Sequence, residues 1–264
     1  MTVAQRARHV GLVLAGGSAR GAYEVGVVRY VLEEVSRAIG EPVPIDIISG
    51  TSAGSINAMM LAAHADNALR GEMLARQWTR LELEDIVRPT PGEVLRTVAR
   101  WLGRSTRGDE KRGGGVLDPA GIERIVRAGA PAGAIGEQIR TGHLSALSIS
   151  TTHVASGKTV IFVQRQGGGA PAWATDPTMV ARPAEIRAEH VLASAAVPLL
   201  FPAVRIDDHF YCDGGLRQNV PLSPARRLGA DGLIVINPRY IRETAPTRAL
   251  AESRERSFPD PLFV

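Results

Sequence analysis

The chain has 264 residues, 44% of them hydrophobic and 22% charged, a composition that excludes both a disordered and a membrane-spanning protein. Its length allows one large core, so we expect a single domain over residues 1–264 with the core at about 9–237. The single cysteine, Cys212, excludes an internal disulfide framework, and the absence of HExxH and paired CxxC spacing implies no metal and no cofactor. The formal net charge of +4 favours anionic partners.

The first predicted element is a buried strand in the apolar run at 10–15. This run is too short for the apolar region of a signal peptide, and no small-residue cleavage pattern follows, so we expect a cytoplasmic protein. Apolar residues then recur at helical spacing over 20–39, and a second apolar strand at 45–49 leads into a turn and a helix that ends near 63. This βαβα order predicts a three-layer α/β/α fold with a mostly parallel central sheet.

The rest of the chain continues the alternation of helices and strands. After residue 63 we expect, in chain order, a helix over about 68–86, a helix over 117–127, a strand pair in "LSALSISTTHV" and "KTVIFVQR", a helix from Pro183 to Ala195, two short strands around Asp207 and Asp208, a helix near 223–228 and a buried strand over 233–237.

Residues 92–115 differ in character from their surroundings. Apolar residues that include Val94, Val98 and Trp101 share one helical face with arginines on the others, and the polar stretch "STRGDEKRGGG" follows. We interpret this segment as a lid or a membrane-contact element. The alternative interpretation is a surface helix that rests on the core.

Ser52 stands in the frame Gly50-Thr51-Ser52-Ala53-Gly54, between a predicted strand and a predicted helix. A sharp strand-to-helix turn of this kind presents a nucleophilic serine at the carboxyl edge of a sheet. It also sets the N–H of Ala53 and the positive end of the helix beside any oxyanion formed there. The alternative is a serine that only caps a helix after a glycine turn.

The stretch "LAGGSARGAYEVG" is a second candidate binding element. Gly16 and Gly21 have the spacing of a nucleotide P-loop, but the Lys-Ser/Thr pair that must follow is missing, and Ser18 replaces the second glycine of a dinucleotide fingerprint. The backbone N–H groups of Gly16, Gly17 and Ser18 can instead converge on an oxyanion at a helix start. Arg20 would add a fixed positive charge; alternatively it is a solvated arginine.

The general base is a separate question. Asp213 stands at the end of a predicted strand, before Gly214 and Gly215, which let the backbone and a substrate come close. A carboxylate within about 2.6–3.2 Å of the serine hydroxyl can act as the base without histidine, provided that burial raises its proton affinity. His190 and His209 are alternative bases on spacing alone, and Asp-Gly-Gly is also a common turn.

With these motifs in hand, the sequence resembles the patatin-like phospholipase family. The resemblance rests on "GGSARG" for the oxyanion loop, "GTSAG" for the nucleophile and "DGG" for the catalytic aspartate, with "ASAAVPLLFPAV" and "GGLRQNVPLSPARRLGAD" in support, and it covers about 10–237. It implies a Ser52–Asp213 dyad that needs no metal, with the amides of residues 16–18 as the oxyanion hole. The family loop usually has glycine where this sequence has Ser18.

The resemblance implies a lipid acyl hydrolase of phospholipase A or lysophospholipase type that works in lipid degradation through an acyl-enzyme intermediate. The expected partners are a phospholipid or another fatty-acyl ester and, transiently, a membrane surface. Nucleic acid is not expected, because the arginines are dispersed and no series of stacking aromatic residues accompanies them. The alternatives are a Ser-His-Asp esterase of α/β-hydrolase type and a non-catalytic module that binds phosphate or lipid.

Overall fold

The computed structural model describes residues 9–82, 117–169 and 176–239. Its strands are β1 (Val10–Leu14), β2 (Ile47–Thr51), β3 (Ala146–His153), β4 (Thr159–Arg165), β5 (Met179–Pro183), β6 (Val204–Ile206), β7 (His209–Asp213) and β8 (Gly232–Ile236). Its helices are α1 (Gly21–Tyr30), α2 (Ser36–Ile39), α3 (Ala53–Ala63), α4 (Arg70–Thr79), α7 (Ala120–Gly129), α8 (Ala134–Arg140), α9 (Ala188–Ser194) and α10 (Leu222–Arg227), with short 3-10 turns η1 (Ser18–Arg20) and η3 (Gly214–Leu216) and a π-helical turn η2 (Val31–Val35).

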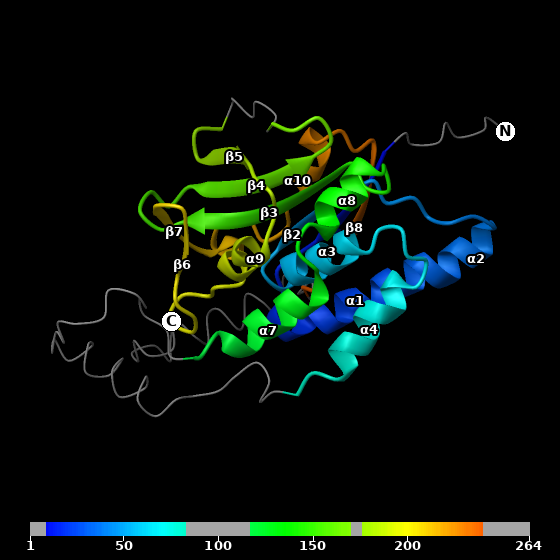
Figure 1. Ribbon diagram of the computed structural model, residues 1–264, viewed down its shortest axis with the longest axis horizontal. Helices are drawn as coiled ribbons and strands as arrows, with labels where there is room; N and C mark the ends of the chain where they lie inside the picture. Colours follow the sequence, from blue (N-terminus) through cyan, green and yellow to red (C-terminus); the bar gives the residue numbers. More distant parts are fainter. Residues whose placement is uncertain (1–8, 83–116, 170–175, 240–264) are drawn as a thin grey trace, which may run out of the picture.

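The strands form one sheet with the order β5-β4-β3-β2-β1-β8, and β7 and β6 extend it beside β3 (Figure 1). β1 pairs in parallel with β2 and β8, and β2 pairs in parallel with β3. β3 and β4 form the antiparallel pair expected from their sequences. The central sheet is therefore mixed and mostly parallel, with helices on both faces, as the βαβα order predicts.

β2 and β7 share one edge of β3. β2 runs parallel to β3 and ends with Thr51 opposite Ser150. β7 runs antiparallel to β3 and ends with Asp213 opposite Thr151. Because Ser150 and Thr151 are consecutive, the carboxyl ends of β2 and β7 meet head-on beside β3. The residue that follows β2 is thereby brought next to the last residue of β7.

The two faces of the sheet carry layers of different thickness. In β1, Leu12 and Leu14 pack into the main core under the layer that includes α1, α3, α4, α7, α8 and α9, whereas Val13 points to the opposite face and packs with Ala225 of α10. Figure 1 shows α1, α4 and α7 below the sheet in that view and α10 above it. The alternation follows from the two-residue period of a strand, and a strand buried on both faces reads as a continuous apolar run.

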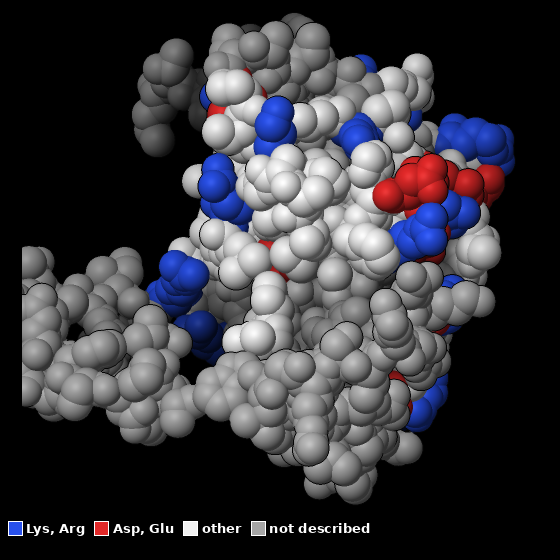
Figure 2. All heavy atoms as spheres, turned by 90° about the vertical axis from the view of Figure 1, so that its left-hand side faces the viewer, with Lys and Arg blue, Asp and Glu red and all other residues white. Residues whose placement is uncertain are grey.

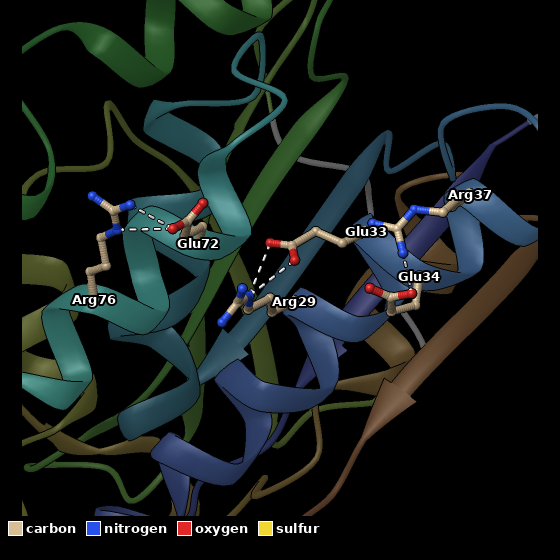
Figure 3. A network of polar contacts seen from close by, with 6 residues as sticks. All are labelled: Arg29, Glu33, Glu34, Arg37, Glu72 and Arg76. Atoms are coloured by element: carbon tan, nitrogen blue, oxygen red, sulfur yellow. Dashed lines mark hydrogen bonds and ion pairs between the residues drawn. The ribbon is translucent and has the colours of Figure 1, made fainter.

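α1 and α4 lie side by side on the surface of the thicker layer. A Cβ built on Gly71 would lie 3.2 Å from Cα of Arg29, so glycine allows the close approach of the two helices. Figure 3 shows ion pairs along this surface that join Arg29 with Glu33, Arg37 with Glu34, and Arg76 with Glu72. Such exposed pairs, each within one helical stretch, stabilise a fold by only about 0.3–0.5 kcal/mol.

The structure corrects two of the predicted elements and adds one that was not predicted. Pro183 does not open a helix, because it ends the edge strand β5, and α9 begins at Ala188. Proline has no N–H to donate, which suits the end of an edge strand as well as it suits the start of a helix. The helix expected over 68–86 ends at Thr79, and α8 was not predicted. The proposed lid at 92–115 lies outside the described residues.

Within 9–82, 117–169 and 176–239, the structure contains no helix with the length and hydropathy required to cross a bilayer.

Candidate active site

Ser52 occupies the turn between β2 and α3 with φ 54° and ψ −125°. A positive φ is rare for a residue with a side chain and is typical of strained functional positions. Both glycines of the frame are required by close contacts, since a Cβ on Gly50 would lie 2.6 Å from the carbonyl oxygen of Gly54, and a Cβ on Gly54 would lie 2.4 Å from that of Leu14. The sequence therefore forms the sharp turn that the motif predicts.

Asp213 is the hydrogen-bond partner of Ser52. Ser52 Oγ donates to Asp213 Oδ2 at 2.7 Å, and the amide of Gly215 donates to Asp213 Oδ1 at 2.6 Å. Both side chains are buried, with 7% and 5% of their surface exposed. Burial raises the pKa of Asp213 above its usual value of 3.8, against the hydrogen bonds from Ser52 and Gly215, which lower it. Position 214, next to Asp213, requires glycine, because a Cβ there would lie 2.2 Å from the carbonyl oxygen of Ser150.

The two histidines considered as alternative bases lie elsewhere. His190 is buried in α9, where its Nδ1 accepts a hydrogen bond from the amide of Arg187 at 3.0 Å, and burial lowers its pKa. His209 begins β7 and packs its ring against His153, with centroids 5.1 Å apart. Within the described part of the chain, neither histidine is hydrogen-bonded to Ser52. The geometry therefore pairs the serine with the carboxylate.

The glycine loop packs directly against the serine. A Cβ on Gly16 would lie 3.2 Å from Cβ of Ser52. The amide of Gly16 donates to the carbonyl of Asn219 at 2.9 Å, and Asn219 Nδ2 donates back to the Gly16 carbonyl at 3.0 Å, so this amide is already engaged within the protein. Gly17 and Ser18 start the turn η1. Amides at a helix start have no intrahelical acceptor and are available to bind an anion.

Arg20 and Gly21 complete the glycine loop. Arg20 is exposed, and its Nε donates to the carbonyl of Gly17 at 3.4 Å, so the guanidinium braces the loop. A Cβ on Gly21 would lie 2.7 Å from the ring of Trp78 and 3.2 Å from Cβ of Ala53. Gly21 thus lets the glycine loop, the helix after Ser52 and an aromatic side chain of α4 come together.

A cavity of about 260 Å³ opens beside Ser52. Its walls are mostly apolar and include Ser18, Ala53, Ile56, Met60, Trp78, Leu81, Leu117, Val197, Leu200 and Phe201. A larger cavity of about 430 Å³ lies near α7, α8 and α9, and its walls include neither Ser52 nor Asp213. Of these two cavities, only the smaller one, with mostly apolar walls, adjoins Ser52.

Glu24 lies under the glycine loop and was not identified from the sequence. The side chain is completely buried; Asn57 Nδ2 donates to its Oε2 at 3.1 Å, and its Oε1 has no partner among the described residues. Burial raises the pKa of Glu24 from 4.5 to about 8. Asn57 Oδ1 accepts from Trp78 Nε1 at 2.8 Å, so the network reaches the cavity wall. The signal in the sequence was the spacing to Val28, which puts Glu24 on the buried face of α1.

Ser194, at the end of α9, was also missed. Its Oγ accepts a hydrogen bond from the amide of Ser52 at 2.9 Å and donates to the carbonyl of Ser150 at 2.6 Å. The side chain is fully buried. Ser194 follows Val191 at the helical spacing i, i+3, which places both on the buried face of α9, and that spacing was the available signal.

Comparisons with known proteins give the family to which the chain is similar. The family model described as Patatin-like phospholipase matches residues 12–226, a stretch that includes both Ser52 and Asp213. Patatin-like phospholipase domain-containing protein 6 of Mus musculus is 26% identical over 228 residues, which are 86% of this chain and 13% of that protein. Patatin-like phospholipase domain-containing protein ZK370.4 of Caenorhabditis elegans is 29% identical over 235 residues, 89% of this chain and 14% of that protein.

Other similarities are shorter or more distant. Lysophospholipase nte1 of Aspergillus terreus is 51% identical over 59 residues, 22% of this chain and 3% of that protein. The crystal structure of VipD from Legionella pneumophila aligns with a TM-score of 0.43 and 16% identity, over 93% of this chain and 53% of that one. The chain spans only 13–14% of the length of the two long curated relatives. The match of the family model over most of the sequence shows that the chain belongs to the patatin-like phospholipase family.

Proposed function

We propose that this protein is a lipid acyl hydrolase of phospholipase A or lysophospholipase type that cleaves fatty-acyl esters through a dyad of Ser52 and Asp213. The observation that carries the proposal is the 2.7 Å hydrogen bond from Ser52 Oγ to Asp213 Oδ2 at the wall of an apolar cavity. Membership of a phospholipase family supports the general class of reaction.

In the acylation step, Asp213 takes the proton of the Ser52 hydroxyl while Oγ bonds to the ester carbonyl carbon. The tetrahedral intermediate collapses when the bond to the leaving alkoxide breaks and that oxygen receives the proton held by Asp213. The products are an acyl-enzyme and a lysolipid or alcohol. Burial of Asp213, which raises its pKa, makes the carboxylate a stronger base than a solvated one.

In the deacylation step, the same carboxylate takes a proton from water, whose oxygen attacks the acyl carbon. The bond to Ser52 Oγ breaks, the serine recovers a proton from Asp213, and the fatty acid leaves. One buried carboxylate therefore serves both half-reactions without a histidine.

The oxyanion of each tetrahedral intermediate would be held by backbone amides. Gly17 and Ser18 at the start of η1 and Ala53 at the start of α3 are the donors that we propose, because the amide of Gly16 is bonded to Asn219. Loss of one such donor typically lowers kcat about 10²–10³-fold.

The cavity beside Ser52 is suited to an acyl chain because its walls are mostly apolar. Leu200 belongs to this wall and is 45% exposed, and the neighbouring Leu199 is 82% exposed, so apolar surface continues from the cavity to the outside. We propose that this rim contacts a membrane surface. Figure 2 shows one face of the molecule, on which some Lys and Arg side chains lie singly on uncharged surface and others gather with Asp and Glu side chains at one side.

The test combines covalent labelling with product analysis. A fluorophosphonate probe should label the wild type and leave Ser52→Ala unlabelled, and mass spectrometry should show free fatty acid released from a mixed lipid extract. Asp213→Ala should lower turnover by about 10²–10⁴-fold, the usual contribution of a general base. The control is Asp208→Ala, which removes an exposed carboxylate that is paired with Arg205.

Each alternative has its own outcome. If Asp213→Ala keeps near-wild-type activity while His190→Ala or His209→Ala abolishes it, the protein is a histidine-dependent esterase. If lipid binds but neither labelling nor release of fatty acid occurs, the glycine loop belongs to a non-catalytic binding module.

A further inference from the structure

The turn that ends α9 holds both members of the dyad by their backbones. Ser194 Oγ accepts the amide hydrogen of Ser52 at 2.9 Å. Two residues later, the carbonyl of Ala196 accepts the amide hydrogen of Asp213 at 2.9 Å. Two residues that lie 161 positions apart in the sequence are therefore fixed to one short stretch of chain.

The same turn is anchored to the strand that orders the site. Ser194 Oγ donates to the carbonyl of Ser150 at 2.6 Å. Ser150 lies opposite Thr51 in the pairing of β2 with β3, and its carbonyl oxygen is the atom against which Gly214 packs. The hydroxyl of Ser194 thus bridges the nucleophile turn and the point of β3 where β2 and β7 meet.

The backbone conformation of Ser52 makes this bridge consequential. With φ at 54°, Ser52 is in a region that residues with side chains rarely adopt, and such a conformation persists only where the surroundings hold it. The bond from its amide to Ser194 Oγ is a fixed contact of this kind, and the buried hydroxyl is the only side-chain oxygen bonded to that amide in the described residues.

We propose that Ser194 is a positioning residue that holds the strained Ser52 turn at hydrogen-bonding distance from Asp213. This inference rests on the proposed function, because it assigns a role in the same reaction. Ser194 is fully buried and is not part of the cavity wall, so it acts through Ser52 and touches no substrate.

The test compares Ser194→Ala with a matched loss elsewhere in the same sheet. Ser148 in β3 is also buried, and its Oγ lies 2.7 Å from Ser49 Oγ, so Ser148→Ala removes a buried hydroxyl pair without contact with the nucleophile. We expect both variants to lose a similar amount of thermal stability, because each leaves buried polar groups without a partner. Only Ser194→Ala should lower kcat, by about 10–10²-fold, since small misplacements of reacting groups have effects of this size.

Two further readouts separate positioning from a general loss of structure. KM for a soluble ester should stay unchanged in Ser194→Ala while the rate of fluorophosphonate labelling falls with kcat. The acid limb of the pH–rate profile should move to higher pH, because the hydrogen bond from Ser52 lowers the pKa of Asp213 and would be weakened. Ser194→Thr, which keeps a hydroxyl, should recover most of the activity; if it does not fold, the comparison with Ser148→Ala decides.

The proposal is overturned if Ser194→Ala keeps kcat within about twofold of Ser148→Ala, or if KM rises while kcat and the labelling rate are unchanged. A wild type that is neither labelled nor active on esters overturns the proposed function itself, and the role of Ser194 in that reaction with it. An active wild type with an unaffected Ser194→Ala overturns the positioning role alone.

Discussion

Glu24→Gln should make the folded protein more stable than the wild type at alkaline pH. The Glu24 carboxyl is completely buried under the glycine loop, and burial raises its pKa from 4.5 to about 8. The folded protein keeps the proton up to about pH 8, whereas the unfolded chain releases it near pH 4.5. The contribution of Glu24 to stability is therefore highest below pH 4.5, falls as pH rises and levels off above pH 8.

The size of the effect follows from the two pKa values. Each pKa unit corresponds to about 1.36 kcal/mol, so the ionised carboxylate disfavours the folded state by up to about 5 kcal/mol. About half of this loss develops as pH rises from about 6 to about 9, over which the free energy of unfolding of the wild type should fall by about 2.5 kcal/mol relative to the glutamine variant. Any effect of the amide on packing is independent of pH and cancels in that comparison.

The assay is urea unfolding of both proteins at pH 6 and pH 9. Glu72→Gln is the control, because Glu72 is bonded to Arg76 and its pKa is lowered, so its carboxyl is ionised in both states throughout this interval. A difference between wild type and Glu24→Gln that is the same at the two pH values would refute the reasoning, since it would mean that the buried carboxyl does not ionise in this range.

Three further predictions concern the site and its loop. The acid limb of kcat/KM should have an apparent pKa above 3.8, measured from a pH–rate profile, because burial raises the pKa of Asp213 and the base must be ionised; a limb at or below that value would contradict the assignment. Ser18→Gly should raise the free energy of unfolding by about 0.5 kcal/mol in denaturant titrations, because Ser18 has φ 50° and glycine adopts this conformation without strain; a loss of stability would show that the side chain holds the loop. Gly54→Ala should destabilise the protein by about 2–3 kcal/mol and abolish activity, because its Cβ would lie 2.4 Å from the Leu14 carbonyl oxygen. The control is Gly26→Ala in α1, which has open space around its Cβ and should stabilise that helix by up to about 1 kcal/mol. Equal effects of the two variants in thermal unfolding would contradict this explanation.

The parts of the fold that could be predicted are the helices and strands whose buried face is marked by regularly spaced apolar residues. The strand at β1, the helix that begins near residue 20, the strand and helix on either side of Ser52 and the β3–β4 pair follow the expected order, with shifts of a few residues at their ends. β2 begins two residues later than predicted, at Ile47. That residues 1–264 form one domain stays a prediction.

The errors arose where local sequence allows two outcomes. Pro183 fits the first turn of a helix and the end of an edge strand equally well, and the pairing of β5 with β4 decides between them. α8 contains Gly136 and follows Gly133, residues that disfavour a helix locally, yet Ile135 and Ile139 are buried in the main core. In both places tertiary contacts outweigh local preference.

In the candidate site, too, residues in short motifs could be predicted and contacts between distant residues could not. Ser52 and Asp213 could be selected as candidates from the sequence because each stands in a short motif with neighbouring glycines. The engagement of the Gly16 amide and the role of Ser194 depend on partners that are distant in the chain: Asn219 is 203 residues from Gly16, and Ser194 is 142 residues from Ser52. No local pattern carries such information, because these hydrogen bonds exist only after the sheet has assembled.

Because β2 and β7 meet beside β3, their pairing with β3 determines the distance between Ser52 and Asp213. One step along β3, from Ser150 to Thr151, sets the offset between the strand that leads to Ser52, the proposed nucleophile, and the strand that ends with Asp213, the proposed base. Such a step measures about 3.3 Å. Segments between these strands can therefore lengthen or shorten during evolution without altering the separation, whereas a single residue inserted at this point of β3 would pull the two apart although neither had been changed.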